Sequence, residues 1–65
     1  MDGIHDIVKT RKVDRWELYF HEVGGVEFLT PDGRALFIAP FAPEKERQAV
    51  LRVLPPRVRE AYLDG

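Results

Sequence analysis

Apolar and polar positions in residues 16–41, WELYFHEVGGVEFLTPDGRALFIAPF, form three short apolar runs separated by two turn signals. In the second signal, TPDGR, Pro31 suits the first turn position and Gly33 suits a left-handed conformation, which predicts a three-residue hairpin loop. In the first, Gly24 and Gly25 lie between two valines, and such a pair predicts a two-residue hairpin turn. The stretch is therefore expected to form three successive antiparallel strands.

The two turns set the strand pairing and hence the face on which each side chain lies. The Gly-Gly turn places His21 opposite Phe28, and the second turn places Phe28 opposite Leu36. Because side chains alternate along a strand, one face is expected to carry Trp16, Leu18, Phe20, Leu29, Ala35, Phe37 and Ala39. The other face is expected to carry Tyr19, His21, Val23, Val26, Phe28, Leu36 and Ile38. Neither face is polar, so each is expected to be covered: one by the C-terminal helices, and the other by either the N-terminal segment or, as we favour, a second protein molecule.

Residues 43–64 predict two short amphipathic helices. Pro43 suits the start of the first helix, and acidic residues follow it at the positive end of the helix dipole. Its apolar positions recur with helical spacing at Ala49, Val50, Val53 and Leu54. Pro56 suits the start of the second helix, whose apolar side consists of Val58, Ala61 and Tyr62. Helices this short are marginal alone, so both are expected to pack on the sheet.

The N-terminal residues 4–10 fit two interpretations. The apolar spacing of the first residues fits one helical turn, whereas DIVKTRKV is rich in β-branched residues and favours a strand. The strand interpretation, which we prefer, has the chain turn at 11–14 into a strand over 15–23, although no glycine or proline marks that turn. The sequence thus predicts an α+β fold in a single domain, 1–65. A small antiparallel β-meander of three or four strands over 1–41 precedes two short C-terminal α-helices over 43–64, packed on one face.

The size of the chain limits how it can be stabilised. A core in a domain of 65 residues supplies roughly 3–5 kcal/mol. The chain has no cysteine, which excludes disulfides, and only His5 and His21 could give nitrogen ligands, so no metal site is expected. A second protein chain is the remaining support, and we expect a homodimer or another protein partner.

Charge and composition exclude several functional classes. The net charge is −1, no apolar run approaches the ~20 residues that cross a bilayer, and MDGIHDIVK lacks the apolar region of a signal peptide. The expected compartment is therefore the cytoplasm, without membrane association. The chain lacks serine and cysteine and shows no cofactor loop, so neither an enzyme nor a cofactor or small-molecule site is expected. Seven arginines against three lysines, with no asparagine, fit either a thermophile or a GC-rich genome.

The histidine and carboxylate neighbours give little sign of chemistry. His21 and Glu22 point to opposite faces of a strand, so they cannot hold one ion together. His21 is expected to be a partly buried structural residue. Glu22 and Glu27 are expected to be cross-strand neighbours whose charged ends stay in water. The Gly-Gly pair joins two strands rather than opening a helix, so it does not predict a phosphate site.

Two functional hypotheses follow. The first is a small non-catalytic interaction protein, homodimeric through an apolar sheet face or edge, because exposed apolar patches on small domains mark binding surfaces. Its expected anchors are Trp16, Phe20, Phe28, Phe37 and Ile38. The second is a small nucleic-acid-binding regulator. Its expected phosphate contacts are Lys9, Arg11, Lys12 and Arg15, supplemented by Arg47, Arg52, Arg57 and Arg59 near the C-terminus.

Overall fold

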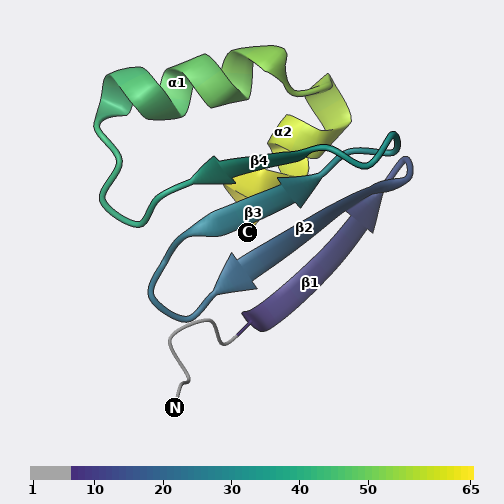
Figure 1. The fold of residues 1–65 in the computed structure, drawn as a ribbon, viewed down its shortest axis with the longest axis horizontal. Coiled ribbons are helices and arrows are strands. Elements are labelled where there is room, and N and C mark those ends of the chain that lie inside the picture. The colour runs from purple at the N-terminus through teal and green to yellow at the C-terminus, as the bar shows by residue number, and fades with distance from the viewer. Residues whose placement is uncertain (1–6) are drawn as a thin grey trace.

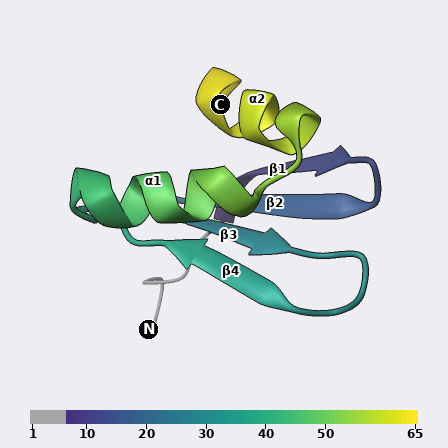
Figure 2. The ribbon, with the colours of Figure 1, turned by 90° about the horizontal axis from the view of Figure 1, so that it is seen from above.

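The computed structural model describes residues 7–65 as one four-stranded antiparallel sheet followed by two helices. The strands are β1 (Ile7–Val13), β2 (Trp16–His21), β3 (Val26–Leu29) and β4 (Ala35–Ile38), and they are adjacent in chain order. The helices α1 (Glu44–Val53) and α2 (Pro56–Asp64) lie on the same side of the sheet (Figures 1 and 2). The expected α+β meander with two C-terminal helices on one face is confirmed.

The strand interpretation of the N-terminal segment is confirmed, but its bounds differ from those expected. Strand β1 continues to Val13, which pairs with Trp16, so the chain turns at Asp14-Arg15 rather than over 11–14. Both turn residues have positive φ, 50° and 70°, as a two-residue type I′ turn requires. Residues 4–6 of the expected strand, and with them His5-Asp6, lie outside the described residues.

The turn between β2 and β3 is not the two-residue turn expected from Gly24 and Gly25. The N–H of Gly24 donates to the carbonyl of His21 (2.9 Å), and the N–H of His21 donates to the carbonyl of Gly25 (2.9 Å). These bonds close a three-residue loop, Glu22–Gly24, in which Gly24 takes a left-handed φ of 107°. The second glycine has a steric role, because a Cβ on Gly25 would lie 3.0 Å from Cζ of Phe37.

This loop moves the pairing of β2 with β3 by three residues from the expected register. Phe20 pairs with Val26 and Leu18 with Phe28, where the expected pairing was Phe20 with Leu29. An odd shift exchanges the faces of one strand relative to its neighbour. The helix-facing side therefore carries Trp16, Leu18, Phe20, Val26, Phe28, Leu36 and Ile38. The expectation that both faces are apolar is wrong, since the open face carries Thr10, Lys12, Glu17, Tyr19, His21, Glu27, Leu29, Ala35 and Phe37.

The hairpin between β3 and β4 has the expected three-residue loop and register. The N–H of Gly33 donates to the carbonyl of Thr30 (3.1 Å), and Gly33 has a φ of 94°. Phe28 pairs with Leu36, as the sequence predicts. The hydroxyl of Thr30 donates to the carboxylate of Asp32, which lowers the pKa of that carboxyl below its ordinary value, with Arg34 contributing.

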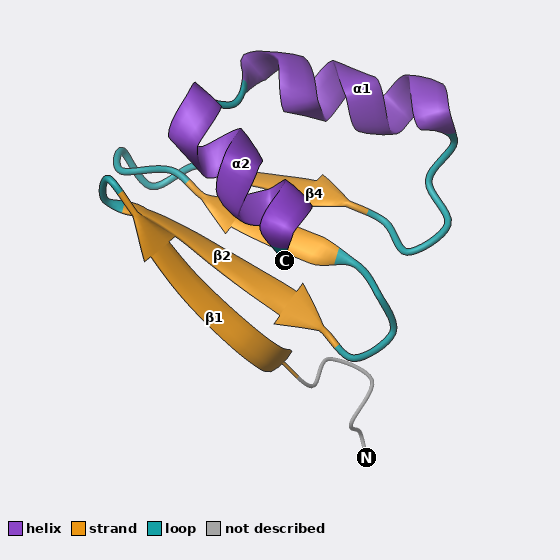
Figure 3. Cartoon of the chain, turned by 180° about the vertical axis from the view of Figure 1, so that it is seen from behind, coloured by secondary structure: helices purple, strands orange, loops and turns teal. Residues whose placement is uncertain are grey.

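The helices supply the second layer of the core. Figure 3 shows α2 in front of the sheet, whereas α1 runs along the β4 side. From α1 and the break after it, Leu51 and Leu54 are buried, whereas Ala49 and Val53 of the expected stripe are exposed. In α2 the expected stripe is confirmed: Val58 and Ala61 are buried, and the Tyr62 ring lies 5.7 Å from that of Phe28. The core comprises Leu18, Val26, Phe28, Ile38, Leu51, Leu54, Val58 and Ala61.

The left-handed Arg15 generates a stability prediction. A non-glycine residue in this conformation costs about 1–2 kcal/mol, whereas glycine loses about 0.5–1 kcal/mol of additional backbone entropy on folding. Arg15→Gly should therefore increase the free energy of unfolding by about 0.5–1 kcal/mol, measured by urea denaturation. Arg15→Ala is the matched control, because it removes the same side chain but keeps a Cβ, and should not stabilise the protein. A gain equal in both variants would contradict the prediction.

Candidate interaction surface

The two edges of the sheet differ in charge. Strand β4, with the sequence ALFI, carries neither charge nor proline. Its pairing directs the backbone groups of Leu36 and Ile38 toward β3, because these groups alternate along an antiparallel strand. Those of Ala35 and Phe37 therefore point to the free edge. Charged side chains and prolines protect an edge strand from pairing, and an edge that lacks them is a template for pairing with another chain.

Exposed apolar side chains extend from this edge over the following loop and the flank of α1. Phe37 is 54% exposed, Phe41 94% and Val53 64%. We call this surface the β4–α1 side, and define it by Ala35, Phe37, Ala39, Phe41, Ala49 and Val53. A hollow of about 350 Å³ lies between β4 and α1. Its lining consists of Phe37, Ile38, Ala39, Ala42, Glu46, Ala49 and Val50.

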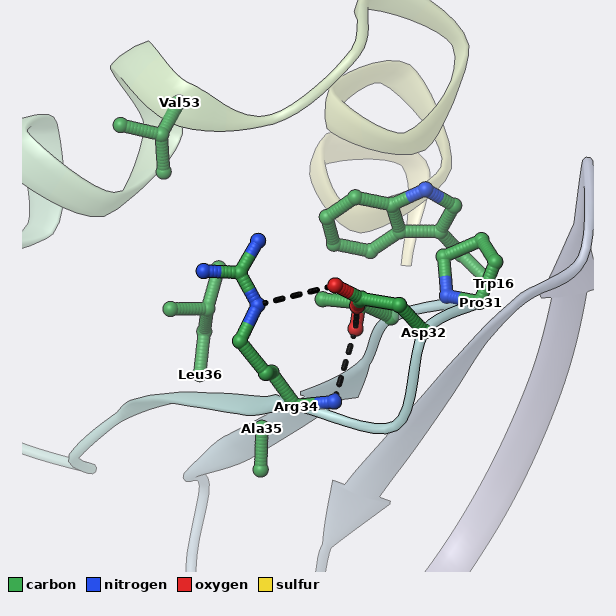
Figure 4. A pocket seen from close by; sticks show the side chains of 8 residues that line it. Trp16, Pro31, Asp32, Arg34, Ala35, Leu36 and Val53 are labelled. Atoms are coloured by element: carbon green, nitrogen blue, oxygen red, sulfur yellow. Dashed lines mark hydrogen bonds and ion pairs between the residues drawn. The ribbon is translucent and has the colours of Figure 1, made fainter.

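A larger cleft of about 570 Å³ lies at the hairpin end of β4. Figure 4 shows Trp16 and Arg34 bordering it, with Val53 of α1 across from them. Its lining consists of Trp16, Thr30, Pro31, Asp32, Arg34, Ala35, Leu36 and Val53. Nε of Arg34 lies 3.2 Å from Oδ2 of Asp32, and this arginine side chain is 80% exposed. The cleft thus combines an aromatic and aliphatic wall with one accessible cation.

The structure separates the five expected anchors. Phe28 and Ile38 are buried under the helices and belong to the core of the chain itself, so we do not place them in an interface. Trp16 and Phe20 are half-buried against that core, and Trp16 also borders the cleft. Phe37 is the one expected anchor whose side chain is largely exposed.

The opposite edge, β1, carries the basic residues of the nucleic-acid hypothesis. Lys9 and Arg11 pair with Phe20 and Leu18, which places them on the helix side, whereas Lys12 pairs with Glu17 and faces the open side. Lys9 is already engaged: Nζ donates to the carbonyl of Gly65 (3.0 Å) and lies 5.5 Å from the centroid of the Phe20 ring. Arg15 lies in the turn.

The C-terminal arginines also have different surroundings. Nε of Arg57 lies 3.4 Å from Oδ2 of Asp14, so this arginine forms an ion pair with the β1–β2 turn. Arg47 pairs with Glu44 on α1, and Nη1 of Arg59 donates to the carbonyl of Leu51 (3.4 Å). Arg52 is exposed on α1. The basic residues therefore lie on several elements, and Lys9, Arg47, Arg57 and Arg59 already contact other groups of the chain.

The open face of the sheet contains two polar contacts. Nε2 of His21 lies 3.3 Å from Oε1 of Glu27, and the His21 ring meets that of Phe37 edge-on at 6.2 Å. The expected pairing of Glu22 with Glu27 is absent, because the shifted register pairs Glu27 with Tyr19. The Tyr19 hydroxyl donates to the Glu17 carboxylate, which raises the pKa of Tyr19 above its ordinary value.

Residues 7–65 contain neither a cluster of metal-ligand residues nor a helix suited to cross a membrane. Within this range, no three histidine, cysteine or acidic side chains gather in a way that could hold a metal ion. No helix in the same range is long and apolar enough to cross a membrane. All buried side-chain nitrogen and oxygen atoms in the described part of the chain have hydrogen-bond partners.

Only Phe37 of the β4–α1 side was an expected anchor, and the two other large residues of this side, Phe41 and Val53, were missed. A signal for Phe41 exists in APFAP, since a large aromatic residue between two prolines lies in neither a strand nor a helix. Val53 has no comparable signal. The sequence pattern placed Val53 in the apolar stripe of the helix, and only the packing of α1 shows that Val53 is exposed and Leu51 is buried.

The pair formed by Tyr19 and Glu17 predicts a pH-dependent change. Glu17→Gln removes the carboxylate, so the pKa of Tyr19 should fall toward its ordinary value of about 10. The pKa is measured from the tyrosinate absorbance of variants that also carry Tyr62→Phe, which leaves Tyr19 as the one tyrosine. Glu60→Gln in the same background is the control. In the parent chain, the contribution of this raised pKa to stability is present below pH ~10 and is lost as pH rises through the folded pKa. An unchanged titration of Tyr19 would contradict the assignment.

The candidate site is therefore the β4–α1 side, with a cleft at the hairpin end of β4 and Phe41 at the other end. It is an apolar surface bordered by the exposed side chain of Arg34, and exposed apolar patches of this kind are common at interaction sites. Comparison of the chain with protein-family models, with curated proteins and with solved structures finds no match.

Proposed function

We propose that this chain is a small non-catalytic interaction protein that forms a homodimer through the β4–α1 side. The observation that carries the proposal is the concentration of exposed apolar side chains along an uncharged edge strand. Isolated apolar residues on a surface need no explanation, but a continuous group beside an open strand edge marks an interaction site. We propose the cytoplasm as the compartment in which the protein acts.

A second copy is the favoured partner because of the charges at the two edges. Two β1 strands brought together would oppose the basic residues Lys9, Arg11 and Lys12 of both copies, and like charges opposite each other destabilise a sheet. Two β4 strands meet without any charge on the strand itself. Self-association is therefore expected at β4 and disfavoured at β1.

The size of the domain supports the same proposal. A chain of 65 residues without cysteine has a small core of its own. Burial of Phe37, Phe41 and Val53 in a dimer interface would add to the apolar surface that the small core buries. Twofold dimers are the commonest symmetric assembly, and such an interface uses the same surface of both copies.

The nucleic-acid alternative has less support. Its basic residues are distributed between both faces of β1, the β1–β2 turn and two helices, and several are engaged with other groups of the chain. A nucleic-acid interface needs its cations on one surface that follows the phosphate backbone.

Equilibrium sedimentation tests the proposal. At high micromolar concentration, the parent chain should sediment as a dimer, and its thermal stability should fall on dilution because dimer stability depends on protomer concentration. Val53→Lys should shift the equilibrium toward the monomer, because it places a charge in the apolar contact.

Leu63→Lys provides the matched control, since Leu63 on α2 is 63% exposed, almost the same as Val53, but lies away from the β4–α1 side. It should leave the dimer unchanged. A strictly monomeric parent chain with a concentration-independent melting temperature would overturn the proposal.

A further inference from the structure

We infer that the two copies associate antiparallel, so that Phe41 of each copy occupies the cleft bordered by Trp16 and Arg34 in the other. This inference rests on the proposed homodimer and specifies how its interface is arranged. It assigns Phe41 as the anchor, the cleft as its receptor, and an intermolecular ion pair of Glu46 with Arg34 as the contact that sets the orientation.

Phe41 has the properties of a preformed anchor. Its side chain is 94% exposed, the largest exposure among the large apolar residues of the described chain. Proline at positions 40 and 43 fixes the backbone on both sides, and the N–H of Ala42 donates to the carbonyl of Ala39 (3.2 Å) across it. An aromatic side chain held on a restrained loop loses little conformational entropy on binding. Anchors of this kind dominate the binding energy of interfaces.

The cleft has the properties of a receptor for such a ring. Its volume of about 570 Å³ is more than sufficient for one phenyl group, since sites of roughly 300–1,000 Å³ hold drug-sized molecules. Trp16, Leu36 and Val53 offer aromatic and aliphatic surface. Contact of a phenyl ring with the indole adds the favourable interaction of an aromatic pair.

The anchor and the receptor lie at opposite ends of β4. The cleft includes Arg34 and Ala35, at the beginning of the strand (Figure 4). Phe41 lies in the loop beyond its end at Ile38. A twofold axis that crosses the middle of β4 exchanges the two ends, so each Phe41 meets the cleft of the other copy. An interface of this type is self-complementary, as twofold symmetry requires.

Charge favours the same orientation. Glu46 borders the hollow at the Phe41 end of the surface, and Arg34 borders the cleft at the other end. Exchange of the ends brings Glu46 toward Arg34 of the second copy. Within residues 7–65 only Asp32 pairs with the Arg34 guanidinium, at Nε, and Figure 4 shows its terminal nitrogens extending toward α1. In a parallel arrangement, the Arg34 ends of the two copies would lie beside each other. The two arginines would then face each other, and both clefts would stay empty.

The first test is truncation of the anchor. Phe41→Ala should raise the dimer dissociation constant at least about tenfold in equilibrium sedimentation, because the cleft of each partner loses its occupant. Leu63→Ala is the matched control and should leave the dissociation constant unchanged. The melting temperature measured under monomeric conditions should be the same for Phe41→Ala and the parent chain, because Phe41 is exposed in the single chain.

The second test reports the orientation. Glu46→Arg and Arg34→Glu should each weaken the dimer about tenfold, and the double variant should recover most of the parent affinity because the ion pair is restored with reversed signs. Glu60→Arg and Arg52→Glu change the net charge by the same amounts at other exposed positions, and should show neither loss nor recovery.

The outcomes separate this inference from the proposal on which it rests. A monomeric parent chain overturns the homodimer itself. A dimeric parent whose affinity is unaffected by Phe41→Ala, or whose charge-reversal variants weaken additively without recovery, keeps the homodimer and overturns the antiparallel arrangement. Loss of affinity with Phe41→Ala together with recovery in the double variant supports the inference.

Discussion

The left-handed backbone at Gly24 determines the organisation of the whole sheet. With this residue at a φ of 107°, the loop between β2 and β3 closes over three residues, and Leu18 pairs with Phe28. That pairing places the large apolar side chains of β2 on the same face as those of β3. The side-chain period of a strand is two, so a loop shorter by one residue would turn one of these groups away from the helices. The buried core under α1 and α2 depends on this one loop length.

The core in turn determines which surfaces are left over. Once Val26, Phe28 and Ile38 are under the helices, the open face of the sheet is mixed rather than apolar, with Glu17 and Glu27 among its residues. Polar groups of this kind interact with water and with each other, as in the contact of His21 with Glu27. Among the exposed large apolar residues, Phe37, Phe41 and Val53 lie on the β4–α1 side. The others, Ile7, Val8, Val23 and Leu63, are distributed over β1, the β2–β3 loop and α2.

The contrast between the edges connects the fold to the proposed function. Strand β1 is protected by its charged side chains, which is a common way to prevent pairing with other chains. Strand β4 lacks this protection and is flanked by exposed apolar residues from the loop after it and from α1. Because both a protruding ring and a cleft lie along the same strand, the surface contains the two complementary parts that a twofold contact needs.

Local signals in the sequence determined the element types and most of their order. Proline and glycine at positions 31 and 33 specify the β3–β4 hairpin, proline at 56 begins α2, and β-branched residues favour β1, because each acts on its own segment of backbone. The sequence alone also determined that disulfides cannot contribute. Arg15 lies outside such rules, since an arginine rarely takes the positive φ that the turn imposes.

Tertiary structure decided the register of β2 on β3, the buried side of α1 and hence the candidate site. Two adjacent glycines are compatible with a two-residue or a three-residue loop, and only the packing of Leu18 and Phe28 in one core selects the second. Leu51 and Val53 are equally apolar, and the contact of α1 with the sheet buries one and exposes the other. Burial depends on which surfaces meet across the whole chain, whereas turn and helix signals depend on a few consecutive residues.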